Sequence, residues 1–314
     1  HHDAEPARRM RRPALTAAGV AAALALTGCA ASSTTGATSP TSPAPSTSSS
    51  ATGPGSPSPV ASVVKVAGDA WSHVHNLAYD GPALLLGTHE GLYRQEPGQP
   101  PQLLSETPFD VMGLTNDGTR WLASGHPGAG EDLPSDLGLR ASDDGTTWTT
   151  LSLLGEVDFH RLTAAGSTIL GVSAHDNALL RSTDAGSTFT RLDNPGVYDV
   201  ALDPGDPTQA LATTQTGPMA SLDTGASWQP VAGAPLLAFL AWTPDGLYGI
   251  APDGTVHVST DGGATWVQRG STGGQPAAAT ADGDRLAVLV GETVLESTDR
   301  GATFSQRLTG IGGH

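Results

Sequence analysis

One eight-residue phrase recurs along this chain, and it constrains the fold more than any other feature of the sequence. The phrase reads STDGGATW from Ser259, and related copies begin at Ala141, Ser182, Ser221 and Ser297. The aspartates aligned at its third position recur at intervals of 41, 39, 38 and 38 residues, and they are Asp143, Asp184, Asp223, Asp261 and Asp299. A regular period of this length indicates a repeat architecture, in which each copy belongs to one structural unit.

Short strands are predicted around every copy. The chain reads STILGVS and ALLRS before the second copy and TFTRL at its end. Alternating runs this short, separated by Gly and Asp, are typical of antiparallel strands, and no stretch shows a convincing helical period. A sixth, degenerate copy lies upstream, where Glu96 and Gly98 take the Asp and Gly positions and Pro101 replaces the aromatic residue. Six such units predict an all-β fold, a six-bladed β-propeller over residues 62–314.

The first 61 residues differ in composition from the rest and are assigned to two segments. Residues 1–28 run from paired arginines through an uncharged stretch rich in Ala and Leu, which predicts a secretory signal peptide. Residues 29–61 are almost entirely Ser, Thr, Pro, Gly and Ala. Such a segment has no apolar face to bury, so we predict a disordered tether.

The signal ends in LTGC, which resembles the lipobox of bacterial lipoproteins. Cleavage there leaves the cysteine as a lipid-carrying N-terminus, and Cys29 is the only cysteine of the chain. The resemblance implies an extracytoplasmic protein that is anchored to the cell membrane by acyl chains on Cys29, with membrane lipid as its partner. The alternative is a plain signal peptide followed by an unrelated cysteine.

The balance of charge is acidic, with a formal net charge of −16. Nucleic acid is therefore not an expected partner, because phosphate binding requires a basic surface. Lys65 is the only lysine, and no glycine-rich phosphate loop precedes it. We interpret the acidity as a solubility feature of an exported surface and expect a monomer.

The repeated phrase resembles the Asp-box, or BNR repeat, of sialidases and related β-propellers. In that family the motif is the hairpin between the third and fourth strands of a blade. Its Asp accepts hydrogen bonds from the turn, its Gly takes a backbone conformation closed to other residues, and its aromatic residue packs between blades. The resemblance implies a structural role for the five aligned aspartates, the alternative being a catalytic or calcium-binding role.

A wider resemblance covers the chain from about Val63 to its end. The combination of the LTGC ending, the Ser/Pro tether, HVHNLA, GTHEGLYR, LASGHPG and LSLLGEVDFH is similar to bacterial secreted lipoproteins described as sialidase-like or glycosylhydrolase-like. That description rests on a motif that specifies turns and not a reaction, so it implies a fold more than an activity.

The histidines of the predicted propeller gather at one end of its first three blades. The innermost strands are expected to begin at HVHNLAYD, DVMGLTND and DFHRLTAA. Their first column holds His73, Asp110 and Asp158, and the next column but one holds His75, Met112 and His160. Because side chains alternate along a strand, both columns face the same way. The ends of the second strands add His89, Glu90, His126 and His175.

Two interpretations of this end stay open. Imidazoles, carboxylates and the Met112 thioether are suitable ligands for a divalent metal or a copper ion. The metal hypothesis places His73, His75, Asp158 and His160 at the core of a site, with His126 on an inserted loop closing over it. The full set of ligand-binding candidates is His73, His75, His89, Glu90, His126, Arg161 and His175. The alternative is that these histidines are ordinary polar lining of a channel mouth.

A glycoside hydrolase is the second functional class. Hydrolysis of a glycosidic bond needs two carboxyl groups, and the candidates at this end are Asp110, Glu156 and Asp158. True sialidase activity is not expected, because neither an arginine triad nor a Tyr–Glu nucleophile pair is recognisable. We therefore favour a membrane-anchored propeller that binds a glycan, a protein or a metal at its histidine-rich end. The alternatives are a glycoside hydrolase of the cell envelope and a scaffold in an envelope complex.

Overall fold

The computed structural model describes residues 62–66 and 73–311. The predicted signal peptide at residues 1–28, the predicted tether at residues 29–61 and Cys29 lie outside this part of the chain. The described residues form strands and turns and contain no helix. Within them there is accordingly no helix with the length and apolar character that crossing a membrane requires.

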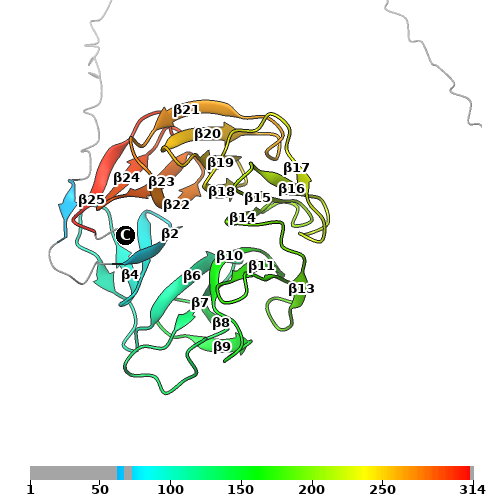
Figure 1. The fold of residues 1–314 in the computed structure, drawn as a ribbon. Coiled ribbons are helices and arrows are strands. Elements are labelled where there is room, and N and C mark those ends of the chain that lie inside the picture. The colour runs from blue at the N-terminus through cyan, green and yellow to red at the C-terminus, as the bar shows by residue number, and fades with distance from the viewer. Residues whose placement is uncertain (1–61, 67–72, 312–314) are drawn as a thin grey trace, which may run out of the picture. The chain divides into compact units, whose positions relative to one another are not determined.

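Six sheets, each built on four antiparallel strands, stand around a central channel, which confirms the six-bladed β-propeller (Figure 1). Each blade uses four consecutive strands, and the first of them lines the channel. Blade one comprises β2 (Val74–Asp80), β3 (Ala83–Thr88), β4 (Gly91–Gln95) and β5 (Gln102–Leu103). Blade two comprises β6 (Asp110–Asn116), β7 (Trp121–His126), β8 (Leu139–Ser142) and β9 (Thr149–Ser152). Blade three comprises β10 (Phe159–Ala165), β11 (Thr168–Ser173), β12 (Leu179–Ser182) and β13 (Thr190–Leu192).

Blades four to six continue the same order around the ring. Blade four comprises β14 (Asp199–Leu202), β15 (Ala210–Thr213), β16 (Met219–Ser221) and β17 (Gln229–Pro230). Blade five comprises β18 (Phe239–Thr243), β19 (Gly246–Ile250), β20 (Thr255–Ser259) and β21 (Val267–Ser271). Blade six comprises β22 (Pro276–Asp282), β23 (Arg285–Val290), β24 (Thr293–Ser297) and β25 (Ser305–Thr309).

The ring closes where the last blade meets the first. The segment before blade one contributes β1 (Val64–Lys65), which pairs in parallel with β25 as a fifth, outer strand of blade six. Beside it, the buried Arg307 of β25 donates from Nε to the side-chain oxygen of Gln95 at 2.7 Å and from Nη1 to Glu296 at 2.5 Å. Gln95 belongs to blade one, so this guanidinium joins the two ends of the folded chain.

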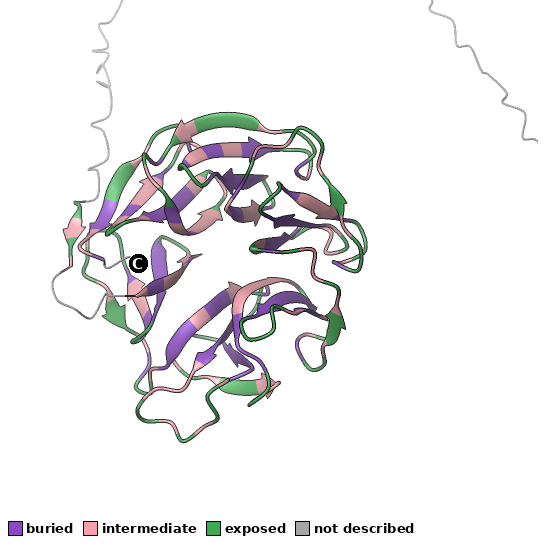
Figure 2. Ribbon diagram, in the orientation of Figure 1, coloured by how far each residue is buried: buried purple, intermediate pink, exposed green. Residues whose placement is uncertain are grey.

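The hydrophobic core lies between neighbouring blades and not at the channel. One cluster packs Leu84 and Leu86 of blade one against Leu289 of blade six, and another packs Leu122 of blade two against Phe159 of blade three. The second strands of the blades are therefore the most buried, whereas the outermost strands are largely exposed (Figure 2). Each blade buries its apolar side chains only by having a neighbour, which is why the repeat has to close into a ring.

The repeated phrase forms the turn between the third and fourth strands of a blade. In the second copy, Ser182 donates its hydroxyl to Asp184 at 2.8 Å and accepts the backbone N–H of Gly186 at 2.9 Å. Asp184 in turn accepts the backbone N–H of Thr188 at 2.9 Å. The same set of bonds forms around Asp223, Asp261 and Asp299. Gly186 has a φ of +89°, a conformation that favours glycine.

The first full copy departs from the alignment of the repeats by one residue. There Ser142 accepts the N–H of Gly145 at 2.8 Å, and Asp144 accepts the N–H groups of Thr146 and Thr147 at 2.8 and 3.0 Å. The residue in the structural role is therefore Asp144 and not Asp143. The turn is one residue shorter, because Ser142 stands three residues before the glycine where the other copies have a spacing of four.

Candidate functional site

The turns and the histidines lie at opposite ends of the propeller. The repeated turn of blade three contacts the connection between β10 and β11, where Ala185 donates its N–H to the carbonyl of Ser167. The histidines instead lie where the innermost strands begin and the second strands end. We call this end, with His75, His89, Asp110, His126, Asp158 and His160, the histidine mouth.

Three β-bulges shape the histidine mouth. His75, Met112 and His160 are the extra residues where the pairing of β2, β6 and β10 shifts register. A bulge re-aims the side chain that it carries. All three residues line one cavity of about 720 Å³ at this end of the channel, together with Arg161 and Tyr198. The predicted column of His75, Met112 and His160 thus faces a single space.

Bonds between blades fix the positions of the two mouth aspartates. Asn76 of blade one donates from Nδ2 to the carbonyl of Met112 at 3.0 Å, and the buried Ser124 of blade two accepts the N–H of Phe159 at 2.9 Å. Gly125 has a φ of +150°, and a Cβ there would lie 1.8 Å from the carbonyl oxygen of Asp110. Only glycine allows β7 to approach the start of β6 this closely.

The first group at the mouth is His75, His89 and Asp110. Asp110 is buried, its Oδ2 lies 2.9 Å from Nδ1 of His89, and its Oδ1 lies 3.4 Å from Nε2 of His75. Burial alone would raise the pKa of Asp110, but hydrogen bonding and charge from the two imidazoles outweigh it and lower the pKa. His73 packs its ring beside this group, with centroid distances of 6.4 Å to His75 and 5.8 Å to His89.

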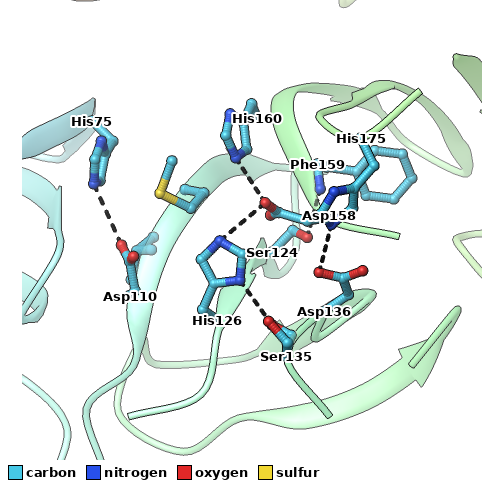
Figure 3. Close-up of polar contacts among 12 residues, drawn as sticks. His75, Asp110, Ser124, His126, Ser135, Asp136, Asp158, Phe159, His160 and His175 are labelled. Carbon is cyan, nitrogen blue, oxygen red and sulfur yellow. Dashed lines mark hydrogen bonds and ion pairs between the residues drawn. The ribbon is translucent and has the colours of Figure 1, made fainter. Parts of the chain in front are cut away.

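The second group is His126, Asp158 and His160, drawn in Figure 3. Asp158 is only 1 % exposed, and its Oδ2 lies 3.2 Å from Nε2 of His126 and 2.7 Å from Nε2 of His160. Its other oxygen, Oδ1, is buried and has no hydrogen-bond partner among the described residues. In each group, one nitrogen from each histidine and one carboxylate oxygen all lie within 4.8 Å of one another, a spacing suited to a metal ion.

The inserted segment between β7 and β8 is bonded to the ends of the second strands. His126 is the last residue of β7 rather than part of the insertion, and its Nδ1 donates to the carbonyl of Ser135 at 2.8 Å. Nε2 of His175 lies 2.9 Å from Oδ1 of Asp136 (Figure 3). This hydrogen bond and the charge of Asp136 raise the pKa of His175. His175 thus holds the loop and belongs to neither group.

The structure distributes the four metal candidates differently from the sequence hypothesis. His75 lies with His89 and Asp110, whereas Asp158 and His160 lie with His126. His73 packs against the first group through its ring. Sequence reasoning missed Asn76, Ser124, Ser135 and Asp136, because their roles depend on contacts across blades or with the insertion.

The other candidates lie around the rim of the mouth. Glu90 and Glu156 are exposed in turns. Arg161 donates from Nε to the carbonyl of Tyr198 at 3.1 Å, and its guanidinium lies 5.0 Å from the centre of the Tyr198 ring. A neighbouring carboxyl that the sequence did not indicate is Asp199, whose pKa is raised by burial and partly lowered again by Arg161.

Comparisons with solved structures give distant β-propellers. The chain is similar to a GH74 xyloglucanase from Xanthomonas campestris at 16% identity and a TM-score of 0.51, covering 79% of this chain and 46% of that one. It is also similar to a gluconolactonase from the same organism (13%, TM-score 0.55, covering 72% and 86%) and to a chain of a nidogen/laminin complex (13%, TM-score 0.55, covering 74% and 100%).

These likenesses establish the fold alone. The chain spans about half the length of the xyloglucanase that it matches, 46%. No protein-family model matches the sequence, and no curated protein matches it. At identities this low, a shared propeller does not carry an activity from one protein to another.

Proposed function

We propose that this protein is a ligand-binding β-propeller that holds a divalent transition-metal ion between His126, Asp158 and His160. The donor set is two imidazole nitrogens and one carboxylate oxygen. Imidazole suits zinc, copper, iron and nickel, and carboxylate completes such sites. An ion with ligands at about 2.0–2.2 Å separates them by roughly 3 to 3.5 Å. Of the two separations from Asp158 Oδ2 in the structure, 3.2 Å to His126 lies within this range and 2.7 Å to His160 lies slightly below it.

The observation that carries the proposal is the orientation of His126. A backbone carbonyl can only accept, so the bond to Ser135 requires a proton on Nδ1 of His126. In the neutral ring, Nε2 then presents a lone pair to Asp158 Oδ2, which is itself an acceptor. A cation between the two atoms removes this repulsion. Metal-bound histidines commonly donate their other ring N–H to a backbone carbonyl in this way.

The burial of Asp158 supports the same conclusion. A carboxylate that is almost fully buried needs compensation by hydrogen bonds or a cation. Oδ2 faces two imidazoles, whereas Oδ1 has no hydrogen-bond partner in the described part of the chain. A bound divalent ion would supply the missing charge. The alternative source of charge is protonation of the histidines to imidazolium, which the metal measurement below distinguishes.

Three protein ligands leave a further position on the ion for water or a bound ligand. His160 and the neighbouring Arg161 line the cavity of about 720 Å³, so a ligand there would reach both the ion and the guanidinium. This arrangement supports binding of a glycan or another polar ligand at the histidine mouth. The ligands that we predict for this position are a glycan, a protein segment or a small anion.

Metal content tests the proposal directly. The full chain, purified without an added polyhistidine tag, is reconstituted with Zn²⁺, dialysed and analysed by mass spectrometry beside His160→Ala. The side chain of His160 is bonded to Asp158 and, unlike that of His126, is not bonded to the inserted loop, so this variant removes a ligand and leaves the bond between His126 and the loop in place. We expect tightly held zinc in the wild type and its loss in the variant, with thermal melts showing both folded. Equal zinc in both chains would refute the site.

The geometry gives less support to glycoside hydrolysis. A hydrolase needs a carboxyl group that can donate a proton. The pKa of Asp110 is lowered by its two histidines, which favours the ionised form. Of the three carboxyl candidates, only Glu156 is free in solvent. The sialidase-like and glycosylhydrolase-like assignment therefore stays a prediction, which a panel of chromogenic glycosides tests.

We further propose export and lipid anchoring through Cys29. The support is the LTGC ending and the tether-like composition that follows it. Expression with a radiolabelled fatty acid should label the wild type, and Cys29→Ser should be unlabelled and no longer sediment with membranes. A labelled Cys29→Ser chain, or an unlabelled wild type in a lipoprotein-competent host, would contradict the anchor.

A further inference from the structure

The two groups of the histidine mouth share one construction across neighbouring blades. His89 and His126 occupy equivalent positions at the ends of the second strands. Each comes directly after the residue that pairs with the one before the bulge, since Thr88 pairs with Val74 and Gly125 pairs with Val111. Each histidine contacts the aspartate that begins the next blade: His89 contacts Asp110 and His126 contacts Asp158. The same pair of ligands therefore recurs at two successive blade interfaces.

The third member of each group comes from a different place. In the first group it is His75, the bulge residue of the blade that carries His89. In the second it is His160, the bulge residue of the blade that carries Asp158. Met112 takes the bulge position of the blade between them. Both groups therefore contain two imidazoles and one carboxylate, although their third members come from different blades. Simple repetition of one blade would not produce this similarity.

We propose that His75, His89 and Asp110 form a second metal site, so that the histidine mouth binds two divalent transition-metal ions per chain. This inference rests on the metal-binding function proposed above. The ligand atoms would be Nε2 of His75, Nδ1 of His89 and a carboxylate oxygen of Asp110, which lie within 4.8 Å of one another. The first-row ions that suit imidazole and carboxylate are the expected occupants.

The second site should bind its ion more weakly than the first. His89 is 57 % exposed at its side chain, and its Nε2 has no hydrogen-bond partner among the described residues. His126 is 34 % exposed and is held by the carbonyl of Ser135. Loss of such an outer partner typically lowers metal affinity by about 10–100-fold. The two sites should therefore fill at separate concentrations of metal.

Calorimetric titration of the metal-free full chain with Zn²⁺ tests the inference. We expect two binding events in the wild type, separated by about 10–100-fold in affinity. His89→Ala should abolish the weaker event and keep the tighter one, and His160→Ala should do the reverse. His89 is exposed, so its replacement leaves the buried packing intact. Asp110→Asn provides a second variant at the same site.

Matched controls set the background. The double variant with His89→Ala and His160→Ala measures zinc bound by the remaining histidines, including His1 and His2. His257→Ala removes a histidine of β20 in blade five, away from the histidine mouth, and it should keep both events.

Several outcomes would overturn the second site and are distinguishable from failure of the first. The second site would be excluded if both binding events persisted in His89→Ala and in Asp110→Asn. It would also be excluded if the wild type showed only one binding event and only His160→Ala removed that event. Loss of both events in His160→Ala, with the fold intact, would indicate one shared site. A chain that binds no zinc above the double-variant background would refute both sites.

Discussion

Aspartates stand at regular positions at both ends of this propeller, but the partners of their carboxylates differ between the two ends. At the turn end, Asp184, Asp223 and Asp261 are exposed and accept bonds from neutral hydroxyl and N–H groups of their own turn. At the histidine mouth, Asp110 and Asp158 are buried and face imidazoles from other strands. An exposed carboxylate needs only local donors, whereas a buried one needs a counter-charge.

The difference also separates the aspartates of the turns from those of the proposed site. A turn aspartate is completed by residues within four positions of it, so each copy can fold in the same way. A mouth aspartate is completed by residues from two strands, and the partners differ between Asp110 and Asp158. Variation in an otherwise repeated fold is where a binding site is expected.

The largest expected effect comes from the mouth. Asp158→Asn keeps the size of the side chain but removes its charge, so we expect zinc affinity to fall by more than about 100-fold, beyond the usual cost of losing an outer partner. Asp261→Asn makes the same chemical change at the turn end and should leave zinc binding unchanged. Calorimetric titration of both variants provides the comparison. Equal affinities in the two would remove the functional distinction between the ends.

Acid should destabilise the turn end as a whole. Bonds from the hydroxyl and N–H of a Thr or Ser lower the pKa of Asp184, Asp223, Asp261 and Asp299 from its ordinary value of 3.8 to about 2. Since the folded pKa lies below the unfolded one, this stability is fully present above about pH 4 and is lost as the pH falls towards 2.

Urea unfolding at pH 5 and pH 3 measures this acid effect. A variant that combines Asp184→Asn and Asp261→Asn should be less stable than the wild type at pH 5, and the difference should shrink at pH 3. A difference that stays constant with pH would show that these carboxylates contribute no pH-dependent stability.

A single turn should matter less. Asp261→Ala removes the acceptor for the N–H and hydroxyl of Thr265, so we expect a melting temperature lower by a few degrees with metal binding intact. Thermal melts followed by circular dichroism measure the change. An unchanged melting temperature would mean that the turn does not depend on its aspartate.

The smallest effect tests the shifted register of the first turn. Asp144→Ala should lower the melting temperature, because Asp144 accepts two backbone N–H groups. Asp143→Ala, one residue earlier and exposed, should change it little. The reverse order of the two variants would restore the alignment that the sequence suggested.

Much of the fold followed from the sequence because the signal was local and repeated. The spacing of the phrase gave the blades, and the strand pattern placed the turns at one end and His73, His75 and His160 at the other. The prediction that Asp143 completes the first turn was wrong. Two adjacent aspartates precede Gly145, and only the hydroxyl of Ser142 decides which of them completes the turn.

The sequence by itself determined the number of blades, the chemistry of the four later turns and the end at which the histidines gather, since each depends on a pattern of residues close together in the chain. Only the tertiary structure decided which histidine meets which aspartate. His89 meets Asp110 and His126 meets Asp158 across the interface between two blades, and the carbonyl of Ser135 orients His126 from the inserted loop. Such contacts depend on β-bulges and blade packing, which residue spacing does not encode.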